Sequence, residues 1–289
     1  MVYIILVNYN GYLDTVDCVK SILDNDYPNY KIIIVDNASA DRDTILNDTF
    51  LTENADILLA GSNDGFSSGN NIGIKCAMSK GCEYVLLLNN DTIVEKNFLS
   101  ELVNCAESNP MTGIVTGRIY CYYDKKTLWY SGGEYNRANG LTNQVLFDES
   151  VKGEKEVTFA SGCMMLISNN CLKKIGLLGE SFFLYSEDTD YCCRVNDSGM
   201  KIIWSSDSVI YHKVSASTGN NSDFQNYYML RNNLYMIQSF GSNKKIAYWK
   251  RRIQCIKDII KRRLNIRTMH WAYADFHKGI KGKGIRFNK

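Results

Sequence analysis

The chain has 289 residues, of which 45% are hydrophobic, enough for one large α/β domain with appendages or for two small domains. The first residues lack a basic start, and no segment is apolar for long enough to span a bilayer, so we expect neither a secretion signal nor a transmembrane helix. The ten cysteines are scattered without a Cys-x-x-Cys pair, which favours free thiols in a reducing cytosol.

The net charge of +2 conceals a strong asymmetry between the body of the chain and its end. Residues 244–289 contain 15 Lys or Arg and two acidic residues, whereas residues 1–243 contain 18 basic and 29 acidic residues. An acidic body with a basic tail indicates an anionic partner, either a membrane or a nucleic acid.

Strands and helices are expected to alternate through the first 120 residues. Apolar, β-branched runs predict strands at 2–7, 31–35, 57–60, 84–88 and 113–120, and helical spacing predicts helices at 12–23, 41–51, 74–80 and 98–105. This alternation indicates an α/β fold with a mainly parallel, Rossmann-like sheet flanked by helices.

Three of these strands end in polar clusters, at residues 8–11, 36–39 and 89–92. Asn and Asp are common in turns, which is the ordinary explanation for any one cluster. In a parallel sheet, however, the carboxyl ends of the strands share one edge, and ligands bind there. Asp91 could hold a divalent cation at this edge, and the cation could hold a diphosphate.

A glycine- and asparagine-rich segment, residues 65–73, opens the helix that continues at 74–80. Glycines permit close approach of the backbone, and the amides at a helix N-terminus favour an anion. The segment is neither a Walker loop nor a Gly-x-Gly-x-x-Gly motif, so a dinucleotide fold is not expected. An ordinary Asn-capped helix is the alternative.

The second half is expected to be less regular over residues 121–155, followed by a strand at 163–167, a helix at 191–196, and short strands at 201–204 and 209–211. Before that helix, the apolar residues of 182–185 lead directly into three acids, Glu187, Asp188 and Asp190. Acids at a helix start complement the helix dipole, but a carboxylate beside apolar surface also has the environment of a general base. His212 follows the last strand.

Seven short motifs in this order resemble those of family 2 glycosyltransferases of the GT-A fold, in the branch of rhamnosyltransferases and galactofuranosyltransferases. They are Val-Asn-Tyr-Asn (7–10), Val-Asp-Asn-Ala-Ser (35–39), Asn-x-Gly-Phe-x-x-Gly-Asn-Asn-x-Gly (63–73), Leu-Asn-Asn-Asp-Thr (88–92), Ser-Gly-Cys-Met-Met (161–165), Ser-Glu-Asp-Thr-Asp-Tyr-Cys-Cys-Arg (186–194) and Tyr-His (211–212). The resemblance implies a GT-A domain over residues 1–240, with a nucleotide-sugar-binding half (1–120) and an acceptor and catalytic half (121–240), followed by a tail (241–289).

The resemblance implies an inverting, metal-dependent sugar transfer from a nucleotide-diphosphate donor. It makes Asp188 the general base, with Glu187 and Arg194 beside it, and gives a divalent cation, Mg²⁺ or Mn²⁺, to Asp91 and His212. It assigns Asp36 to the nucleobase and Asn8 and Asn10 to the nucleoside. Further substrate contacts are implied for Asn37, Asn63, Gly65, Phe66, Asn70, Asn90, Ser161 and Gly162.

One departure from the family pattern concerns the metal motif. Asn89-Asn90-Asp91 has amides where an Asp-x-Asp motif has its first acid. One carboxylate binds a cation less firmly than two, so metal affinity should depend more on the diphosphate and on His212.

The tail is expected to form a basic amphipathic helix. Its apolar residues recur at spacings of three and four, and Lys and Arg fill the positions between them; the apolar positions are Ile246, Trp249, Ile253, Ile256, Ile260 and Leu264. Such a helix could lie on an anionic membrane, or pack on the body or on a partner subunit. Nucleic acid is not expected as a partner, because no reader motif accompanies the charge. Deleting residues 244–289 is expected to release the protein from anionic liposomes.

The leading hypothesis is a cytoplasmic enzyme of surface-polysaccharide, capsule or cell-wall synthesis, peripheral at the inner face of the plasma membrane, acting on a saccharide or lipid-linked acceptor. Rhamnose from a deoxythymidine diphosphate donor is the first candidate sugar by resemblance. A sugar-phosphate nucleotidyltransferase is one alternative, but Asn8–Tyr12 lacks the basic Gly-rich loop of that class. A non-catalytic carbohydrate- or nucleotide-binding module is another. A homo-oligomer is left open.

Overall fold

The computed structural model describes residues 1–214 and 222–287, so the last two residues of the predicted tail lie outside the described part. Its strands are β1 (Val2–Asn8), β2 (Tyr30–Asp36), β3 (Ala55–Leu59), β4 (Tyr84–Asn89), β5 (Thr92–Val94), β6 (Thr112–Cys121), β7 (Leu128–Ser131), β8 (Glu134–Asn136), β9 (Leu141–Asn143), β10 (Glu154–Val157), β11 (Met164–Ser168) and β12 (Lys201–His212).

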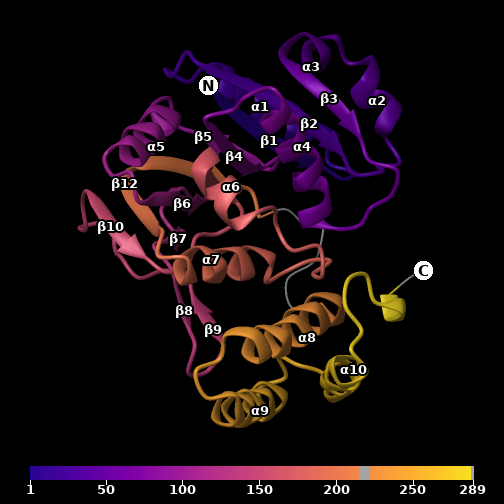
Figure 1. Cartoon of the computed structure of the whole chain (residues 1–289). Coiled ribbons are helices and arrows are strands. Elements are labelled where there is room, and N and C mark those ends of the chain that lie inside the picture. The colour runs from indigo at the N-terminus through magenta and orange to yellow at the C-terminus, as the bar shows by residue number, and fades with distance from the viewer. Residues whose placement is uncertain (215–221, 288–289) are drawn as a thin grey trace.

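The helices are α1 (Tyr12–Leu23), α2 (Arg42–Asn47), α3 (Thr49–Asn54), α4 (Phe66–Ser79), α5 (Phe98–Glu107), α6 (Asn169–Ile175), α7 (Glu187–Asp197), α8 (Asp223–Phe240), α9 (Lys244–Ile260) and α10 (Ile266–His277), with a short 3-10 turn at Ile285–Phe287. Figure 1 shows the sheet and its helices in the upper part of the molecule and α8, α9 and α10 together below α7.

The described strands form one ten-stranded sheet and a small hairpin of β8 and β9. The order in the large sheet is β10-β12-β6-β11-β4-β1-β2-β3, with β5 added to β12 and β7 to β6. Strands β4, β1, β2 and β3 are parallel, as their alternation with helices predicts. Strand β11 runs antiparallel between β4 and β6, so the second half of the sheet is mixed.

The core is built on this sheet because its central strands are apolar on both faces. Ile4 and Ile5 of β1 and Leu86 and Leu87 of β4 are fully buried. Burying each such side chain contributes about 1.5–3 kcal/mol to the stability of the fold. The apolar runs therefore fix the positions of the strand ends, where the polar residues begin.

Helix α4 begins at Phe66, earlier than the predicted helical start at residue 74, so most of the glycine-rich segment is helical. Glycine is a poor helix former, and close packing explains its presence here. A Cβ on Gly69 would lie 2.8 Å from the Val7 side chain, and one on Gly73 would lie 2.6 Å from that of Ile5. The glycines therefore let α4 lie directly against β1.

Two other elements differ from the sequence-based expectation. The helix predicted at 41–51 is interrupted at Asp48, whose extended backbone starts α3 and whose carboxylate accepts a hydrogen bond from the Leu51 amide at 2.9 Å. The two short strands predicted at 201–204 and 209–211 are one strand, β12, with an irregularity in its pairing with β6 between Trp204 and Val209.

The basic tail forms two helices instead of one, and its second helix joins the body. Helix α9 ends at Ile260, and α10 packs on α8, where Tyr227, Tyr228 and Ala272 share a buried cluster with Phe183. Farther along, Gly282 bridges to Phe182, and its amide donates to the Ser181 carbonyl at 2.7 Å. Among the described helices, none is long and apolar enough to cross a membrane.

Candidate active site

The polar ends of β1, β2 and β4 meet at one edge of the sheet, as predicted. Asn8 is in register with Asp36, and Val7 with Asn89. The Asn8 amide donates to Asp36 Oδ1 at 3.1 Å and to Ser39 Oγ at 2.9 Å. Parallel pairing alone brings these residues together, because each one ends its strand at the same level.

The Asp36 carboxylate is fully buried and held in its ionised form. Burial by itself raises the pKa of Asp36, but hydrogen bonds from Ser39, Asn8 and Arg42 lower it below its ordinary value. The Arg42 Nε lies 3.2 Å from Asp36 Oδ2. Asn10 lies beside this group, and its side-chain oxygen accepts from the Ala40 amide at 2.8 Å.

Asn90 joins the β4 end to the start of α1. Its amide donates to Thr15 Oγ1 at 2.8 Å and approaches Asn8 Oδ1 at 3.4 Å. Thr15 Oγ1 in turn donates to Asn8 Oδ1 at 3.0 Å. Asn90 therefore contributes to holding Asn8 and α1 in place.

A second group forms at the N-terminus of α4. The Asn37 amide donates to Asn63 Oδ1 at 3.0 Å, and Asn63 Oδ1 also accepts from the Gly65 amide at 3.1 Å. Gly65 has φ +99°, and a Cβ there would lie 2.0 Å from the Phe183 carbonyl oxygen. Gly65 is therefore required both for its backbone conformation and for the contact between α4 and the segment that precedes Glu187.

Three further residues of α4 differ in their roles. The Phe66 ring lies against Gly162, where a Cβ would be 3.1 Å from it. The Asn70 amide is buried and donates to the Phe66 carbonyl at 3.0 Å within the helix. Asn71 exchanges hydrogen bonds with the Leu178 backbone and donates to Glu180 Oε1 at 2.7 Å, a long-range link that sequence reasoning missed.

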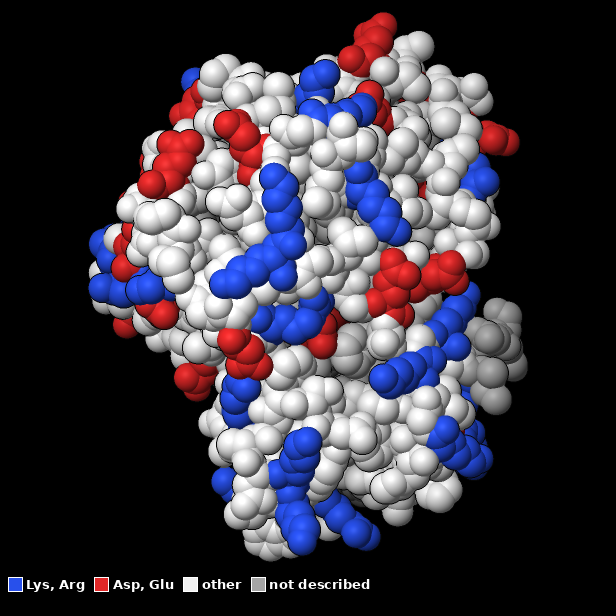
Figure 2. All heavy atoms as spheres, in the orientation of Figure 1, with Lys and Arg blue, Asp and Glu red and all other residues white. Residues whose placement is uncertain are grey.

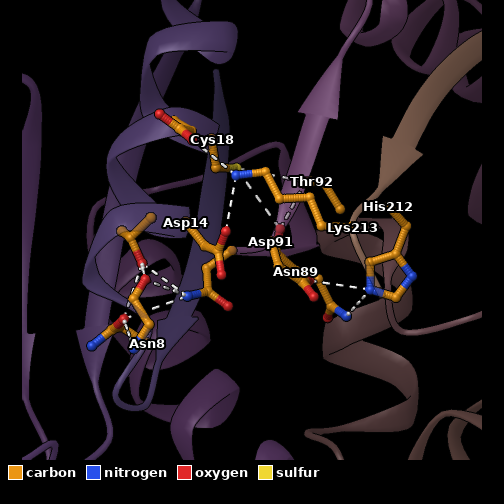
Figure 3. A network of polar contacts seen from close by, with 12 residues as sticks. Asn8, Asp14, Cys18, Asn89, Asp91, Thr92, His212 and Lys213 are labelled. Carbon is orange, nitrogen blue, oxygen red and sulfur yellow. Dashed lines mark hydrogen bonds and ion pairs between the residues drawn. The ribbon is translucent and has the colours of Figure 1, made fainter. Parts of the chain in front are cut away.

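Asp91 and His212 lie side by side, as the metal-site prediction requires (Figure 3). The His212 Nε2 atom is 3.1 Å from Asp91 Oδ1, and both side chains are buried. The contact arises because β5 pairs antiparallel with the end of β12, which sets His212 opposite Thr92. The Trp129 ring and the imidazole pack edge to face, with their centroids 4.6 Å apart. Burial alone lowers the pKa of His212, but the Cys163 thiol and the Asp91 carboxylate raise it well above its ordinary value.

The Asp91–His212 pair has too few ligands to bind a cation alone, and it would suit a cation that a substrate also binds. Among the described residues, no group of three or more His, Cys, Asp or Glu side chains forms a metal cage. Mg²⁺ commonly takes only one or two protein ligands and completes its shell with phosphate oxygens and water. Asp91 would supply a carboxylate, and His212 would supply a ring nitrogen after losing its proton, so the donor set suits a divalent cation whose other positions are open to phosphate oxygens and water.

Lys213 holds the His212 end of β12 against α1. Its ammonium lies 2.9 Å from Asp14 Oδ1 and 2.9 Å from Asp17 Oδ2, and its backbone amide donates to the Asp91 carbonyl at 2.9 Å (Figure 3). Its side chain is buried, and hydrogen bonds to the two carboxylates raise its pKa although burial by itself lowers it. The helical spacing of Asp14 and Asp17 was visible in the sequence, but their partner was not.

Asp188 is linked through residues 161–163 to the strand end beside Asp91. Its Oδ2 atom accepts from the Gly162 amide at 3.2 Å, and its Oδ1 atom from the Thr189 amide at 2.7 Å. One residue before Gly162, Ser161 Oγ accepts from the Cys163 amide at 3.3 Å. The Cys163 carbonyl in turn accepts from the Asn89 amide at 3.0 Å. Residues 161–163 therefore connect the carboxylate of Asp188 to the end of β4.

The two neighbouring carboxyls differ in burial and in protonation. Glu187 is buried, and one of its oxygens has no hydrogen-bond partner among the described residues, whereas Asp188 is partly exposed. Burial and the charge of Asp188 raise the pKa of Glu187 to about 8. Burial also raises the pKa of Asp188, but hydrogen bonds from Gly162 and Thr189 oppose that rise. Because Asp188 is partly exposed and accepts from two backbone amides, it is the better placed of the two carboxyls to carry a negative charge.

Arg194 is engaged with other parts of the chain. Its Nε donates to Asp190 Oδ2 at 2.9 Å, and its two terminal nitrogens donate to the Ile175 and Leu177 carbonyls at 3.2 and 3.0 Å. The structure does not bring its guanidinium to the Asp188 carboxylate, and these contacts give it a role in holding α7.

Asn232 supports the backbone just before the Glu187–Asp188 pair, and sequence reasoning missed it. Its fully buried amide donates to the carbonyls of Leu184 and Tyr185, both at 2.8 Å. Tyr185 and Ser186 have φ +67° and +74°, a conformation that costs non-glycine residues of order 1–3 kcal/mol each. No local pattern in the sequence links α8 to this turn.

The mixed sheet with its polar carboxyl edge has the architecture of a GT-A glycosyltransferase. The family model for glycosyl transferase family 2 matches residues 3–176, more than half of the chain. The chain therefore belongs to family 2 of the glycosyltransferases, and it is an enzyme of that class, as predicted.

Curated relatives agree with the predicted rhamnosyltransferase-like branch. The chain is 24% identical over 246 residues to the dTDP-rhamnosyl transferase RfbF of Shigella flexneri, covering 82% of this chain and 80% of RfbF. It is 25% identical over 214 residues to the rhamnosyltransferase WbbL of Escherichia coli strain K12, covering 70% of this chain and 79% of WbbL.

The solved structure of GalNAc-T7 with UDP, GalNAc and Mn²⁺ has the same fold. It superposes with a TM-score of 0.66 at 14% sequence identity, over 85% of this chain and 49% of that chain. The present chain thus spans about half the length of that structure. The likeness supports the GT-A fold, and the Mn²⁺ and UDP are ligands of GalNAc-T7.

Proposed function

We propose that this family 2 enzyme is an inverting, metal-dependent glycosyltransferase that uses a nucleotide-diphosphate sugar. The observation that carries the proposal is the placement of Asp188, which is partly exposed, held by two backbone amides and linked through residues 161–163 to the strand end beside Asp91. The base takes the proton of the hydroxyl that attacks the anomeric carbon, and the diphosphate leaves that same carbon, so the base and the diphosphate site must flank one carbon.

In the proposed step, an acceptor hydroxyl attacks the anomeric carbon of the donor. The new bond forms from the hydroxyl oxygen, the bond from that carbon to the diphosphate oxygen breaks, and the hydroxyl proton passes to Asp188. A carboxylate in this role contributes about 10²–10⁴-fold to the rate. A divalent cation held by Asp91 and His212 would neutralise charge on the departing diphosphate.

The nucleoside is proposed to bind around Asp36, whose ionised carboxylate can accept from a nucleobase N–H. Asn8 is hydrogen-bonded to Asp36, Asn10 and Asn37 lie beside it, and Asn63 accepts from Asn37. For the phosphates, the N-terminus of α4 offers the positive end of a helix dipole.

Rhamnose from a deoxythymidine diphosphate donor is the first candidate sugar, on the grounds of the similarity to RfbF and WbbL. The acceptor is proposed to be a saccharide, free or lipid-linked, in the synthesis of a surface polysaccharide on the cytoplasmic side of the membrane.

A thermal-shift screen of nucleotide sugars with and without Mn²⁺ identifies the donor, because a ligand that binds the native state raises the melting temperature. With that donor, Asp188→Asn is expected to lower kcat by about 10²–10⁴-fold while the donor still raises the melting temperature. If Asp188→Asn transfers sugar as fast as the parent protein, Asp188 is not the base.

A further inference from the structure

Helix α9 has one apolar side that faces away from the protein. The side chains of Trp249 and Ile260 are 64% and 76% exposed, and those of Ile246 and Ile256 are 48% and 49% exposed. Together with the half-buried Ile253 they recur every three or four residues, so they lie along one side of the helix. We call these five residues the outer α9 face.

The opposite side of α9 accounts for its packing on the body. Ala247 and Cys255 are fully buried, and Tyr248 donates to the Leu234 carbonyl of α8 at 3.3 Å. The helix is therefore held without using the outer α9 face. Large apolar side chains in such a row are costly to leave in water, and a contiguous exposed patch of this kind marks a binding surface.

Cations border this face on both sides. By helical spacing, Lys245 and Arg252 lie along one edge, and Lys250 and Lys257 along the other, and all four are exposed. The one acid of the helix, Asp258, is half-buried and accepts from Gln254 at 3.0 Å. Figure 2 shows Lys and Arg gathered over the lobe of the C-terminal helices, while most acidic side chains lie on the upper part of the molecule.

A cavity of about 220 Å³ opens between α9 and the β8–β9 hairpin, next to the outer α9 face. Lys250, Arg251, Lys257 and Ile253 line it from the helix, and Asn139 and Leu141 from the hairpin. The Arg251 Nε atom is buried and has no hydrogen-bond partner among the described residues. A buried donor without an acceptor is unfavourable, and three cations around a small cavity suit a phosphate group.

We propose that the outer α9 face lies on the surface of a bilayer that contains anionic phospholipid. The isoleucines and Trp249 enter the interface between head groups and acyl chains, the bordering cations contact lipid phosphates, and the cavity receives one head-group phosphate. An apolar stripe with Lys and Arg on both sides is the pattern of helices that lie in this interface.

Membrane binding through the outer α9 face is separate from sugar transfer, and deletion of the whole tail would disturb both. Deleting residues 244–289 would also remove Gly282, whose carbonyl accepts from Arg231 at 2.7 Å, and Asp275, which accepts from Tyr227 at 2.6 Å. Those contacts support α8 and hence the turn before Glu187. Substitutions on the exposed face leave them in place.

The experiment measures co-sedimentation of the full chain with phosphatidylcholine vesicles, with and without phosphatidylglycerol. The parent protein is expected to bind only the vesicles with anionic lipid, less so at high salt. Lys250→Gln with Lys257→Gln should weaken binding by about 30-fold, since each charge near the surface contributes about fivefold. Ile256→Asp with Ile260→Asp should abolish it. Met111→Asp, at a side chain 48% exposed, and Lys152→Gln are matched controls that should bind like the parent.

Three outcomes overturn the proposal. The first is a parent protein that does not bind anionic vesicles, and the second is an Ile256→Asp, Ile260→Asp variant that binds them like the parent. The third is a parent that is dimeric by light scattering and becomes monomeric in that variant, which would make the face an interface between two copies. Transfer to a water-soluble acceptor, measured in parallel, should be the same in all variants, so failure here is distinct from failure of the catalytic proposal.

Discussion

Replacing Asn232 by Asp is expected to impair catalysis from a distance. Asn232 does not touch the Asp188 carboxylate, but its amide holds the carbonyls of Leu184 and Tyr185, both at 2.8 Å. Its oxygen accepts from the Arg231 Nε and Nη2 atoms at 3.1 and 3.0 Å. The substitution keeps an oxygen that can pair with Arg231, but it replaces the donating nitrogen by an oxygen that faces the two carbonyl oxygens and repels them.

The expected magnitude follows from those two hydrogen bonds and the strained backbone behind them. Each bond contributes about 0.5–1.5 kcal/mol net, so the variant should lose about 1–3 kcal/mol of unfolding free energy. Tyr185 and Ser186, at φ +67° and +74°, can then relax and shift Glu187 and Asp188. A displacement of about 1 Å at a reacting group can cost about 10²-fold, so kcat should fall by about 10–100-fold with little change in the donor KM.

The assay is steady-state transfer with the donor identified by thermal shift, combined with urea denaturation. Asn233→Asp is the matched control, because the neighbouring Asn233 amide donates to the Gly140 carbonyl of the β8–β9 connection and not to the catalytic turn. Adding Ser186→Gly to Asn232→Asp should recover part of kcat, since glycine adopts positive φ without the penalty of about 1–2 kcal/mol. Equal kcat values for Asn232→Asp and Asn233→Asp would refute the reasoning.

Two further predictions concern the charged groups of the site. Asp91→Asn removes the carboxylate of the metal pair, so the Mn²⁺ concentration for half-maximal activity should rise by about tenfold or more; an unchanged Mn²⁺ titration would contradict the metal assignment. Glu187, with its pKa raised from 4.5 to about 8, keeps its proton in the folded state while the unfolded state releases it. As the pH rises from 4.5 to about 8, the free energy of unfolding should therefore fall by up to about 1.4 kcal/mol per pH unit. Urea denaturation at pH 5 and pH 8 should show a smaller loss of unfolding free energy in Glu187→Gln than in the parent protein. An equal loss in the two proteins would contradict the raised pKa of Glu187.

The sequence by itself determined the parallel half of the sheet, strands β4, β1, β2 and β3, and the level at which its polar residues lie. Apolar runs end at Asn8, Asp36 and Asn89. Parallel pairing places Asn8 opposite Asp36 and Asn89 opposite Val7, so the three strand ends lie at nearly the same level of the sheet. Family membership was also readable, since the motifs that carry it are local. The predicted convergence of these strand ends is confirmed by the observed hydrogen bonds between Asn8 and Asp36 and between Asn90 and Asn8.

Only the tertiary structure decided which contacts join segments that are far apart in the chain. The start of α4 at Phe66 depends on Gly69 and Gly73 lying against β1, which local propensity opposes. The Asp14–Lys213 pair and the support from Asn232 each join residues far apart in the chain, where no spacing rule applies. In the tail, the sequence predicted an amphipathic helix. Only packing against the body determined that Ala247 and Cys255 are buried and that Trp249 and Ile260 are exposed.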